Sequence, residues 1–486
     1  MTAGEIAADP HDRFEHPLVA RYASDEMVRL FAARTRVETW RRLWVALAEA
    51  QAELGIGGVT AEQAAALKEA AGRIDFARAE ALEQELRHDV MAHLHAFAEA
   101  APVARPILHL GATSASIVDN ADLILQREAL RAIERKALCV VQALADFAAE
   151  HADRPTLAWT HFQPAQPTTV GKRACLWIAD LLLDLDEIGY RLETFRLRGL
   201  KGTTGTQASF LALTGGDPER TDELERRFLS KLGAHRSFPV TGQTYSRKVD
   251  AAWAATLAGV AQSAGKFSQD LRLLQHLGEL REPFGARQVG SSAMAYKRNP
   301  MRAERMSGLS RLVIQTAGNL MYTAATQWLE RSLDDSAVKR IAMPELFLGV
   351  DALLVLYHGI ATGLEVETGT IDRRLRAELP ALASEDLLMA AVESGGDRQA
   401  LHERIRVRAR EAAARVATGE GNDLLDRLAG EEGFAGIPSA LWERARDPAA
   451  YVGRAPEQTR RFLADHVHPR LAMRKGSLEM TGDVRV

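Results

Sequence analysis

The sequence predicts an all-α protein whose centre is a bundle of long helices. The stretch from 112 to 154 contains neither glycine nor proline, so nothing in it interrupts a helix. Apolar residues recur within it at steps of three or four, which is the spacing of one helical face. They are Leu130, Ile133, Ala137, Val140, Leu144 and Phe147. No sustained alternation of apolar and polar residues, which would favour strands, stands out.

Similar patterns continue along the chain. Further long helices are predicted over 168–198, 249–281, 302–330 and 341–364. Shorter helical segments lie on both sides of this block and are separated by glycine-rich breaks. We therefore expect an N-terminal helical domain (1–112), a central helical bundle (113–366) and a C-terminal helical domain (367–486). Segments 207–214 and 237–241 are predicted to be short strands at most.

Composition excludes several classes of protein. The 61 lysines and arginines nearly balance the 65 aspartates and glutamates. This balance argues against nucleic acid or a membrane surface as a partner, because either would favour a basic excess. The most apolar tract, 346–357, is interrupted by Asp351 and is too short to span a bilayer. Residues 1–17 lack the pattern of a signal peptide, and two cysteines make no disulfide framework, so we expect a cytoplasmic protein.

The bundle pattern also bears on assembly. Long helices that carry apolar residues on more than one side are typical of bundles that bury the extra faces against other subunits. We therefore expect a homo-oligomer.

Polar segments interrupt the helical pattern, and the first two of them contain histidines. Segment 87–93 is followed by segment 109–114, which lies at the start of the long helix, where free amides and the helix dipole favour anions. A plain helix cap explains Thr113 and Ser114 equally well. Segment 160–169 places His161 among hydrogen-bonding side chains in a loop that enters a helix. Histidine suits general acid or base catalysis, although a single histidine is more often structural.

Two later segments add glycines, hydroxyls and cations. Segments 201–210 and 241–250 alternate glycines with hydroxyl residues, which suits either an anion cradle or an ordinary turn; the spacing is not that of a P-loop. Segment 290–300 begins with glycine and serine and lies between two long helices, as expected of a loop that closes over a ligand. Arginines follow near helix ends. Any one of these arginines is explained as a charged residue on the surface, but together they indicate a small substrate that carries several negative charges.

These segments resemble the adenylosuccinate lyase family of the fumarase/aspartase superfamily. Segment 290–300 is similar to the signature loop of that superfamily, and the other segments follow in the order found in this family. The resemblance covers residues 21 to 471. The matching blocks are 21–24, 87–93, 109–114, 160–173, 201–210, 241–250, 290–305 and 333–336.

The resemblance implies a fold, an assembly and an activity. The fold is the three-domain, all-α fold of the superfamily, and a homotetramer shares each active site between three subunits around a core of twenty helices. The substrate is a succinyl nucleotide, either adenylosuccinate, which gives AMP, or SAICAR, which gives AICAR. Fumarate is eliminated in both reactions, and no metal or cofactor takes part.

The resemblance also implies roles for single residues. Ser291 is the expected general base and His161 the expected general acid. Lys297 and Asn299 are expected at the carboxylate on which negative charge builds, and His88 near the substrate. The remaining expected substrate-binding residues are Arg21, Tyr22, Arg87, Asp89, Thr113, Ser114, Gln243, Arg305, Arg331, Ser336 and Arg340.

The signature loop departs from the family pattern at Ala295, where the family has proline. Proline fixes φ, so alanine leaves the open loop with more conformational entropy, by roughly 0.4–1 kcal/mol. Ser291 is a weak base unless its environment stabilises the alkoxide, and Lys297 and nearby backbone amides are the candidates for this role.

Other interpretations remain at this point. Argininosuccinate lyase and a carboxymuconate cycloisomerase belong to the same superfamily, but segments 87–93 and 160–166 argue against both. A catalytically silent helical scaffold would be expected to lack the acid and base residues, which are present. A metal site at His88, His93 and His95 would need further carboxylate or cysteine ligands.

Overall fold

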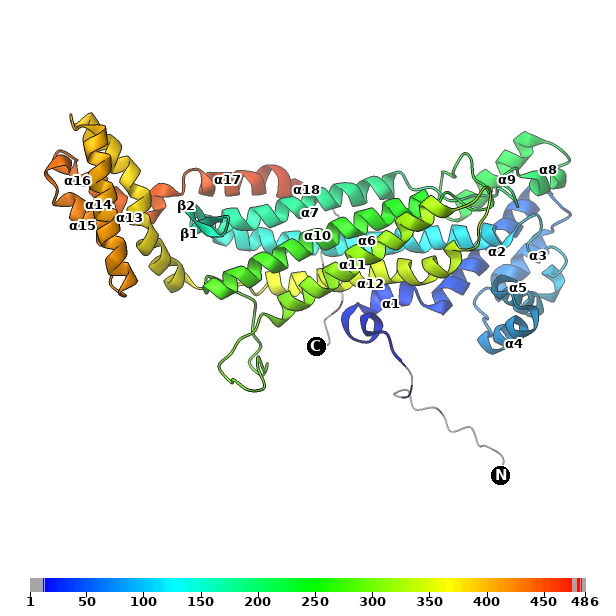
Figure 1. Cartoon of the computed structure of the whole chain (residues 1–486). Helices are drawn as coiled ribbons and strands as arrows, with labels where there is room; N and C mark the ends of the chain where they lie inside the picture. The colour runs from blue at the N-terminus through cyan, green and yellow to red at the C-terminus, as the bar shows by residue number, and fades with distance from the viewer. Residues whose placement is uncertain (1–11, 13, 474–478, 481, 483–486) are drawn as a thin grey trace, which may run out of the picture.

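The computed structural model describes residues 12, 14–473, 479–480 and 482, and it confirms the all-α prediction. The long helices run side by side through the centre of an elongated molecule (Figure 1). They are α6 (Ser114–Glu150), α7 (Val170–Glu193), α10 (Lys248–Leu277), α11 (Met301–Thr326) and α12 (Asp335–Ala361). Each overlaps its predicted range, although α12 begins at Asp335 rather than at residue 341.

The apolar stripe predicted on the first long helix faces the bundle core. Leu130, Ile133, Ala137, Val140 and Leu144 of α6 are almost fully buried, in one cluster with residues of α7, α10, α11 and α12. Alanines are frequent in this cluster, and small side chains let helices approach closely. The burial of this stripe explains why helices of this length are stable.

The bundle has two distinct ends. Helices α6, α10 and α12 begin at the end that carries the N-terminal helices, which we call the pocket end (Figure 1). The connection between α6 and α7 and the loop between α10 and α11 lie at the opposite end, which we call the hairpin end.

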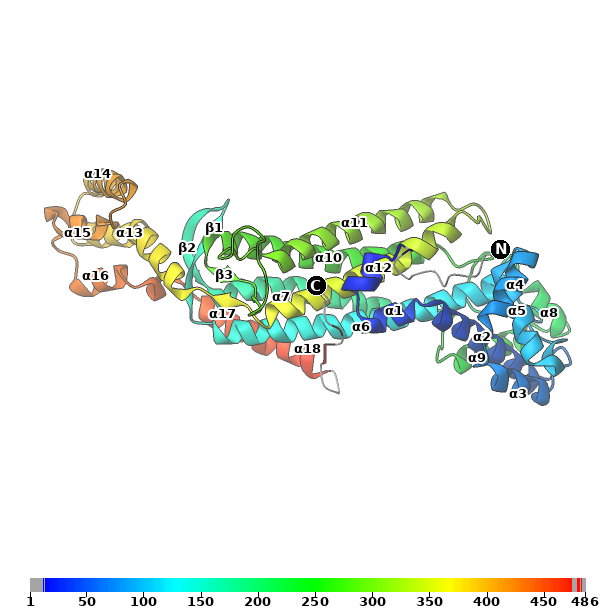
Figure 2. The same cartoon turned by 90° about the horizontal axis from the view of Figure 1, so that it is seen from below.

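The N-terminal helices pack around a second apolar cluster at the pocket end (Figure 2). Residues 197–245 of the central segment join the same cluster, including Phe210 and Phe228. The short π-helical turn η2 (Leu18–Tyr22) packs instead against α12. The elements of this region are α1 (Asp25–Leu30), α2 (Ala33–Leu54), α3 (Ala61–Ala70), α4 (Phe76–Leu86), α5 (Asp89–Ala100), η3 (Pro102–Ala104), α8 (Ala208–Leu213) and α9 (Pro218–Lys231).

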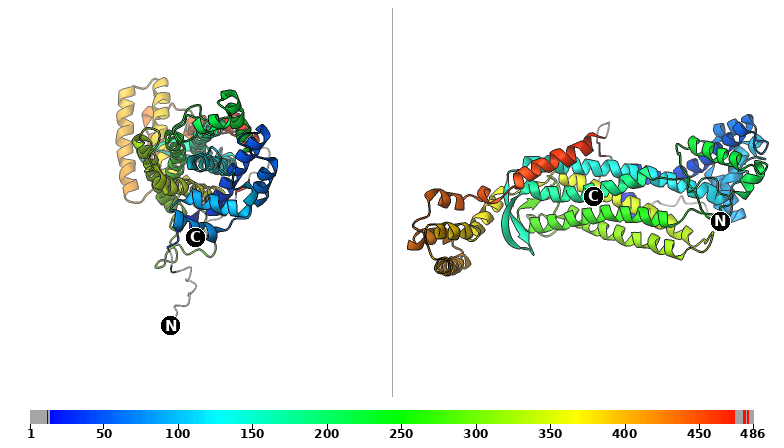
Figure 3. Two further views of the ribbon diagram at one scale, coloured as in Figure 1. Left: turned by 90° about the vertical axis from the view of Figure 1, so that its right-hand side faces the viewer. Right: turned by 90° about the horizontal axis from the view of Figure 1, so that it is seen from above.

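The C-terminal helices extend beyond the hairpin end and then return (Figure 3). Helices α13 to α16 enclose a separate apolar cluster that includes Leu387, Leu428 and Phe434. Leu463 and Val467 lie further along the chain and belong to the bundle core. The elements are α13 (Thr368–Glu393), α14 (Arg398–Ala417), α15 (Leu424–Ala429), η4 (Glu432–Phe434), α16 (Ser439–Ala445), η5 (Pro448–Tyr451), α17 (Ala455–Phe462), η6 (Leu463–Val467) and α18 (His468–Ala472). The division at 112 and 366 stays a prediction.

The strands differ from the sequence prediction. An antiparallel hairpin of β1 (Pro155–Thr160) and β2 (Gln163–Thr169) lies where no strand was expected, and β3 (Leu280–Arg281) pairs with β4 (Glu365–Val366). The possible strand at 207–214 is instead helix α8, because Phe210 turns into the N-terminal core. Of 237–241, only Ser237 makes an isolated bridge, to Leu197.

Helix α12 is longer than its apolar tract predicted. By length and composition it is the one helix among the described residues that could cross a membrane, and 78% of its most apolar window is buried inside the protein. Packing in the bundle core accounts for this composition.

Candidate active site

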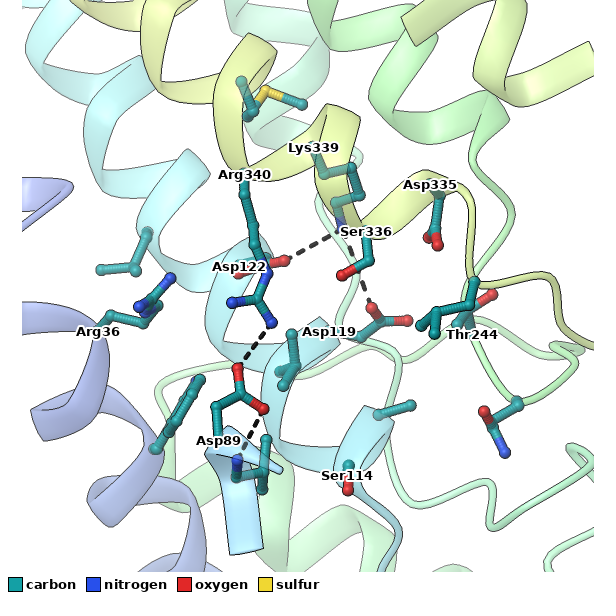
Figure 4. A pocket seen from close by; sticks show the side chains of 18 of the residues that line it. Arg36, Asp89, Ser114, Asp119, Asp122, Thr244, Asp335, Ser336, Lys339 and Arg340 are labelled. Atoms are coloured by element: carbon teal, nitrogen blue, oxygen red, sulfur yellow. Dashed lines mark hydrogen bonds and ion pairs between the residues drawn. The ribbon is translucent and has the colours of Figure 1, made fainter. Parts of the chain in front are cut away.

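A cavity of about 460 Å³ lies at the pocket end, between the bundle and the N-terminal helices (Figure 4). Helices α5, α6 and α12 all begin at this cavity, with Asp89, Ser114 and Asp335 as their first residues. Their free amides and dipoles make the cavity favourable for anions. It brings together half of the predicted site residues, namely His88, Asp89, Thr113, Ser114, Gln243, Arg331, Ser336 and Arg340.

The start of α6 contacts the start of α5. The hydroxyl of Ser114 lies 3.3 Å from Nε2 of His88, within hydrogen-bond distance. The backbone amide of Thr113 donates to the hydroxyl of Ser116 at 3.2 Å. Thr113 therefore caps the helix together with Ser116, whereas Ser114 lines the cavity and contacts a histidine.

Arg340 of α12 reaches across the cavity to Asp89 of α5. Its guanidinium donates to Oδ2 of Asp89 at 2.7 Å, and the amide of Val90 donates to Oδ1 at 2.7 Å (Figure 4). Burial opposes ionisation of Asp89, but Arg340 and the Val90 amide outweigh it, so the pKa of this carboxyl lies below its ordinary value.

A buried ionic network forms the floor of the cavity. Arg247 donates to Asp335 at 2.6 Å and to Asp119 at 3.0 Å. Arg331 donates to the other oxygen of Asp335 at 2.7 Å. Burial opposes ionisation of Asp119, but Arg247 and Lys339 hold the pKa of its carboxyl below the ordinary value. These ion pairs thus link α6 to the starts of α10 and α12 beside the cavity.

Lys339 extends this network from α12. Its ammonium lies 3.1 Å from Asp122 and donates to the hydroxyl of Tyr245 at 3.0 Å, which donates in turn to Asp250 at 2.6 Å. Burial alone would lower the pKa of Lys339, but Asp250, Tyr245 and Asp122 raise it well above its ordinary value.

Sequence reasoning did not single out these network residues. Arg247 and Asp335 lie inside segments that were recognised as polar, so a weak signal existed for both. Asp119 and Lys339 lie inside long helices, where a charged residue most often faces solvent. Their burial is visible only once the helices are packed.

Apart from Arg36, whose guanidinium stacks over the ring of Trp40, the arginines and the lysine that line the cavity already have carboxylate partners. Arg247 pairs with Asp119 and Asp335, and Lys339 with Asp122. The Arg331 and Arg340 side chains are the more exposed cations, at 25% and 49%. An anionic ligand would therefore compete with Asp335 and Asp89 for these two arginines.

Several predicted residues lie outside this cavity. The guanidinium of Arg305, near the start of α11, stacks 5.7 Å from the ring centroid of Tyr22, next to the exposed Arg21 in η2. Arg87 is exposed at the end of α4, in a left-handed conformation with φ of 55°.

Ser291, Lys297 and Asn299 lie on the loop between α10 and α11, which projects from the bundle (Figure 1). The hydroxyl oxygen of Ser291 accepts the backbone amides of Ala293 at 3.3 Å and Met294 at 3.1 Å. Two amide donors stabilise negative charge on this oxygen. The Asn299 amide donates to the carbonyl of Gly290 at 2.8 Å, and Lys297 is exposed.

His161 occupies the tip of the β1–β2 hairpin rather than a loop that enters a helix. His161 and Phe162 form its two-residue turn, and both have positive φ, at 54° and 58°. This is the conformation that a tight hairpin turn requires and that residues other than glycine rarely adopt. The imidazole at this turn is exposed.

The length of α6 separates His161 from the cavity. Ser114 begins this helix and the hairpin follows its end, and 37 residues span about 55 Å at roughly 1.5 Å per residue. Even if the six-residue strand β1 ran straight back along α6, it would shorten the distance between His161 and the cavity by only about 20 Å. The predicted site residues of one chain therefore lie in separate places.

Other polar segments serve packing. In segment 201–210, Lys201 forms a buried ion pair with Glu225 at 2.8 Å. A side chain at Gly205 would lie 1.8 Å from the carbonyl of Thr241, so this turn supports the segment that leads to Gln243. The described residues contain no group of three or more histidine, cysteine, aspartate or glutamate side chains placed to hold a metal ion.

Comparison with known proteins identifies the class and then the family. A family model described as "Lyase" matches residues 20–315, and one described as "Adenylosuccinate lyase C-terminus" matches residues 380–462. The 3-carboxy-cis,cis-muconate lactonizing enzyme from Pseudomonas putida has a TM-score of 0.80 at 24% identity, covering 94% of this chain and 99% of that one. That structural likeness supports the fold.

Sequence identity to curated relatives is much higher. Adenylosuccinate lyase of Saccharomyces cerevisiae is 48% identical over 94% of this chain and 95% of its own length. Adenylosuccinate lyase of Schistosoma mansoni is 44% identical over 98% of this chain and 100% of its own length. The chain therefore belongs to the adenylosuccinate lyase family, which confirms the resemblance inferred from the polar segments.

Proposed function

We propose that the protein eliminates fumarate from adenylosuccinate, giving AMP, and from SAICAR, giving AICAR. The observation that carries this proposal is the 48% identity to a curated adenylosuccinate lyase over almost the whole chain. The cavity adds a chemical reason. Helix N-termini, hydroxyls and the arginines Arg331, which is partly exposed, and Arg340, which is exposed, suit a substrate that carries a phosphate and carboxylates.

In the proposed reaction, Ser291 removes a proton from the carbon β to the departing nitrogen. The electron pair moves into the adjacent carboxylate, where Lys297 and Asn299 stabilise the growing charge. The carbon–nitrogen bond then breaks, its electrons pass to nitrogen, and His161 supplies the proton. The two amides at the Ser291 hydroxyl support its role as the base.

The proposed active site is assembled from several subunits of a homotetramer. The 37-residue helix between the cavity and His161 supports this arrangement. Exposed apolar side chains recur every seven residues on α7, at Leu176, Leu183 and Tyr190, as on a helix that packs against another copy. We place this assembly in the cytoplasm, because both cysteines are buried and unpaired.

An absorbance assay tests the activity. Purified protein is incubated with adenylosuccinate, with SAICAR and, as a control, with argininosuccinate. We expect fumarate release from the first two substrates only. Turnover of argininosuccinate alone, or of none of them, would refute the proposal.

A further inference from the structure

The loop that carries Ser291 is closed at its base by a buried carboxylate. Glu282 follows strand β3 at the entry to the loop and is 3% exposed. Its two oxygens accept the backbone amides of Arg302 at 3.0 Å and Ala303 at 2.9 Å, at the start of α11. One side chain thus joins the entry of the loop to its exit.

Helix α11 needs this contact, because it cannot cap itself. The residue before it is Pro300, which has no side-chain acceptor for the free amides of the first turn. Glu282 supplies the missing acceptors from 20 residues earlier in the chain. A carboxylate at this position also has a favourable interaction with the helix dipole.

Two neutral side chains reinforce the base of the loop. The amide oxygen of Gln275 accepts the backbone amide of Glu282 at 3.3 Å, and its nitrogen donates to the carbonyl of Arg298 at 3.0 Å. Asn299 then donates to Gly290, the residue before Ser291. The positions of Ser291 and Lys297 relative to α11 therefore depend on this set of contacts.

We propose that Glu282 is a positioning residue, which fixes the orientation of the Ser291 loop by capping α11 across the base of that loop. The proposal rests on the assignment of Ser291 as the base. Glu282 acts through the loop backbone and does not touch the substrate. Its removal therefore affects the chemical step more than binding in the cavity, which lies at the other end of the bundle.

Replacement by glutamine is the sharpest test. Glu282→Gln keeps the size of the side chain but turns one acceptor into a donor that faces a backbone amide. We expect kcat to fall at least tenfold and KM to change less than threefold, because small displacements of a catalytic group cost orders of magnitude in rate. Glu282→Asp retains both acceptors, so its kcat should lie between those of Glu282→Gln and the parent. Limited proteolysis should cut segment 283–299 faster in Glu282→Gln.

A matched control separates positioning from general stability. Asp217 caps α9, far from the loop, by accepting the amide of Arg220 at 3.1 Å. Asp217→Ala should lower Tm without lowering kcat at 25 °C. An unchanged kcat in Glu282→Gln, or an equal loss of kcat in Asp217→Ala, would overturn the proposal.

If the parent turned over neither succinyl nucleotide, the proposed function would fail. Proteolysis would then decide alone, and equal cleavage rates would overturn the role of Glu282.

Discussion

Asp89 and Arg340, 251 residues apart in sequence, form an ion pair of 2.7 Å across the cavity. The carboxylate of Asp89 therefore accepts a hydrogen bond from the guanidinium of Arg340, to which an anionic ligand would also bind. Asp119 and Asp335 share a second cation in Arg247 and are almost fully buried, whereas the Asp89–Arg340 pair is partly exposed. An anion that binds the Arg340 donor held by Asp89 therefore competes with this pair.

Asp89→Asn should tighten binding of inorganic phosphate. Removing the competing carboxylate leaves Arg340 available, and a partly exposed ion pair is worth up to about 1 kcal/mol, or about fivefold in affinity. Titration calorimetry at fixed salt measures the effect. Arg340→Ala should weaken phosphate binding, and equal affinities in all three proteins would argue against competition at this site.

His161→Ala and Ser291→Ala should each lower kcat by about two decades or more, as is typical for general acid–base groups. Both residues are outside the apolar cores, so circular dichroism and Tm should match the parent. Near-parental turnover in both variants would show that the acid and base are assigned wrongly.

Mixing the two inactive variants should restore part of the activity. In a mixed tetramer some sites receive an intact histidine from one subunit and an intact serine from another. Native mass spectrometry verifies subunit exchange, and each variant incubated alone is the control. Exchange without recovered turnover would indicate sites built within single chains.

Ala295→Pro should reduce the conformational freedom of the exposed signature loop before a ligand binds. Less entropy is then lost on ordering, so KM should fall by less than about fivefold while kcat changes little. Steady-state kinetics and limited proteolysis of segment 290–300 measure both effects. Identical values in the two proteins would make Ala295 a neutral substitution.

Stability should fall below about pH 6.5 because of His109. Burial lowers the pKa of this histidine to about 4 in the folded protein, where its ring accepts a hydrogen bond from Trp44. Below the unfolded pKa of about 6.5 the unfolded chain binds a proton that the folded chain does not, so unfolding becomes easier by at most about 1.4 kcal/mol per pH unit down to the folded pKa.

Replacing His109 with asparagine isolates this effect. His109→Asn places an acceptor near the same position, and asparagine tolerates the φ of 71° found there. Chemical denaturation at pH 7 and at pH 5 should show a smaller loss of stability in the variant. Equal losses would assign the acid sensitivity to other groups.

The long helices were predictable because their signal is local. The stripe from Leu130 to Phe147 repeats over many turns, and the polar segment that ends at Ser114 marks the start of α6. The β1–β2 hairpin was missed because Pro164 and Pro167 argue against a strand, although an edge hairpin tolerates them. The sequence also favoured a helix-entering loop for His161, because a turn of His161 and Phe162 lacks the usual glycine or asparagine.

The buried ionic network was not predictable in the same way. Asp119 and Lys339 look like ordinary helix-surface charges until α6, α10 and α12 pack and enclose them together. Their spacing in sequence carries no information about that enclosure. Segment 201–210 illustrates the opposite case, because its glycines suited a ligand cradle and instead allow a close backbone crossing at Thr241.

Because helix α6 is rigid, the turnover rate should depend on the concentration of the protein. A solitary subunit cannot bring His161 to its own cavity by any motion short of unfolding. For the proposed shared site, the rate per mole of chain should then decline on dilution through the range in which the tetramer dissociates, and it should do so more steeply than for an enzyme with independent subunits. A substitution on the outer face of α7 would reduce the rate by mass action alone, without touching a reacting group.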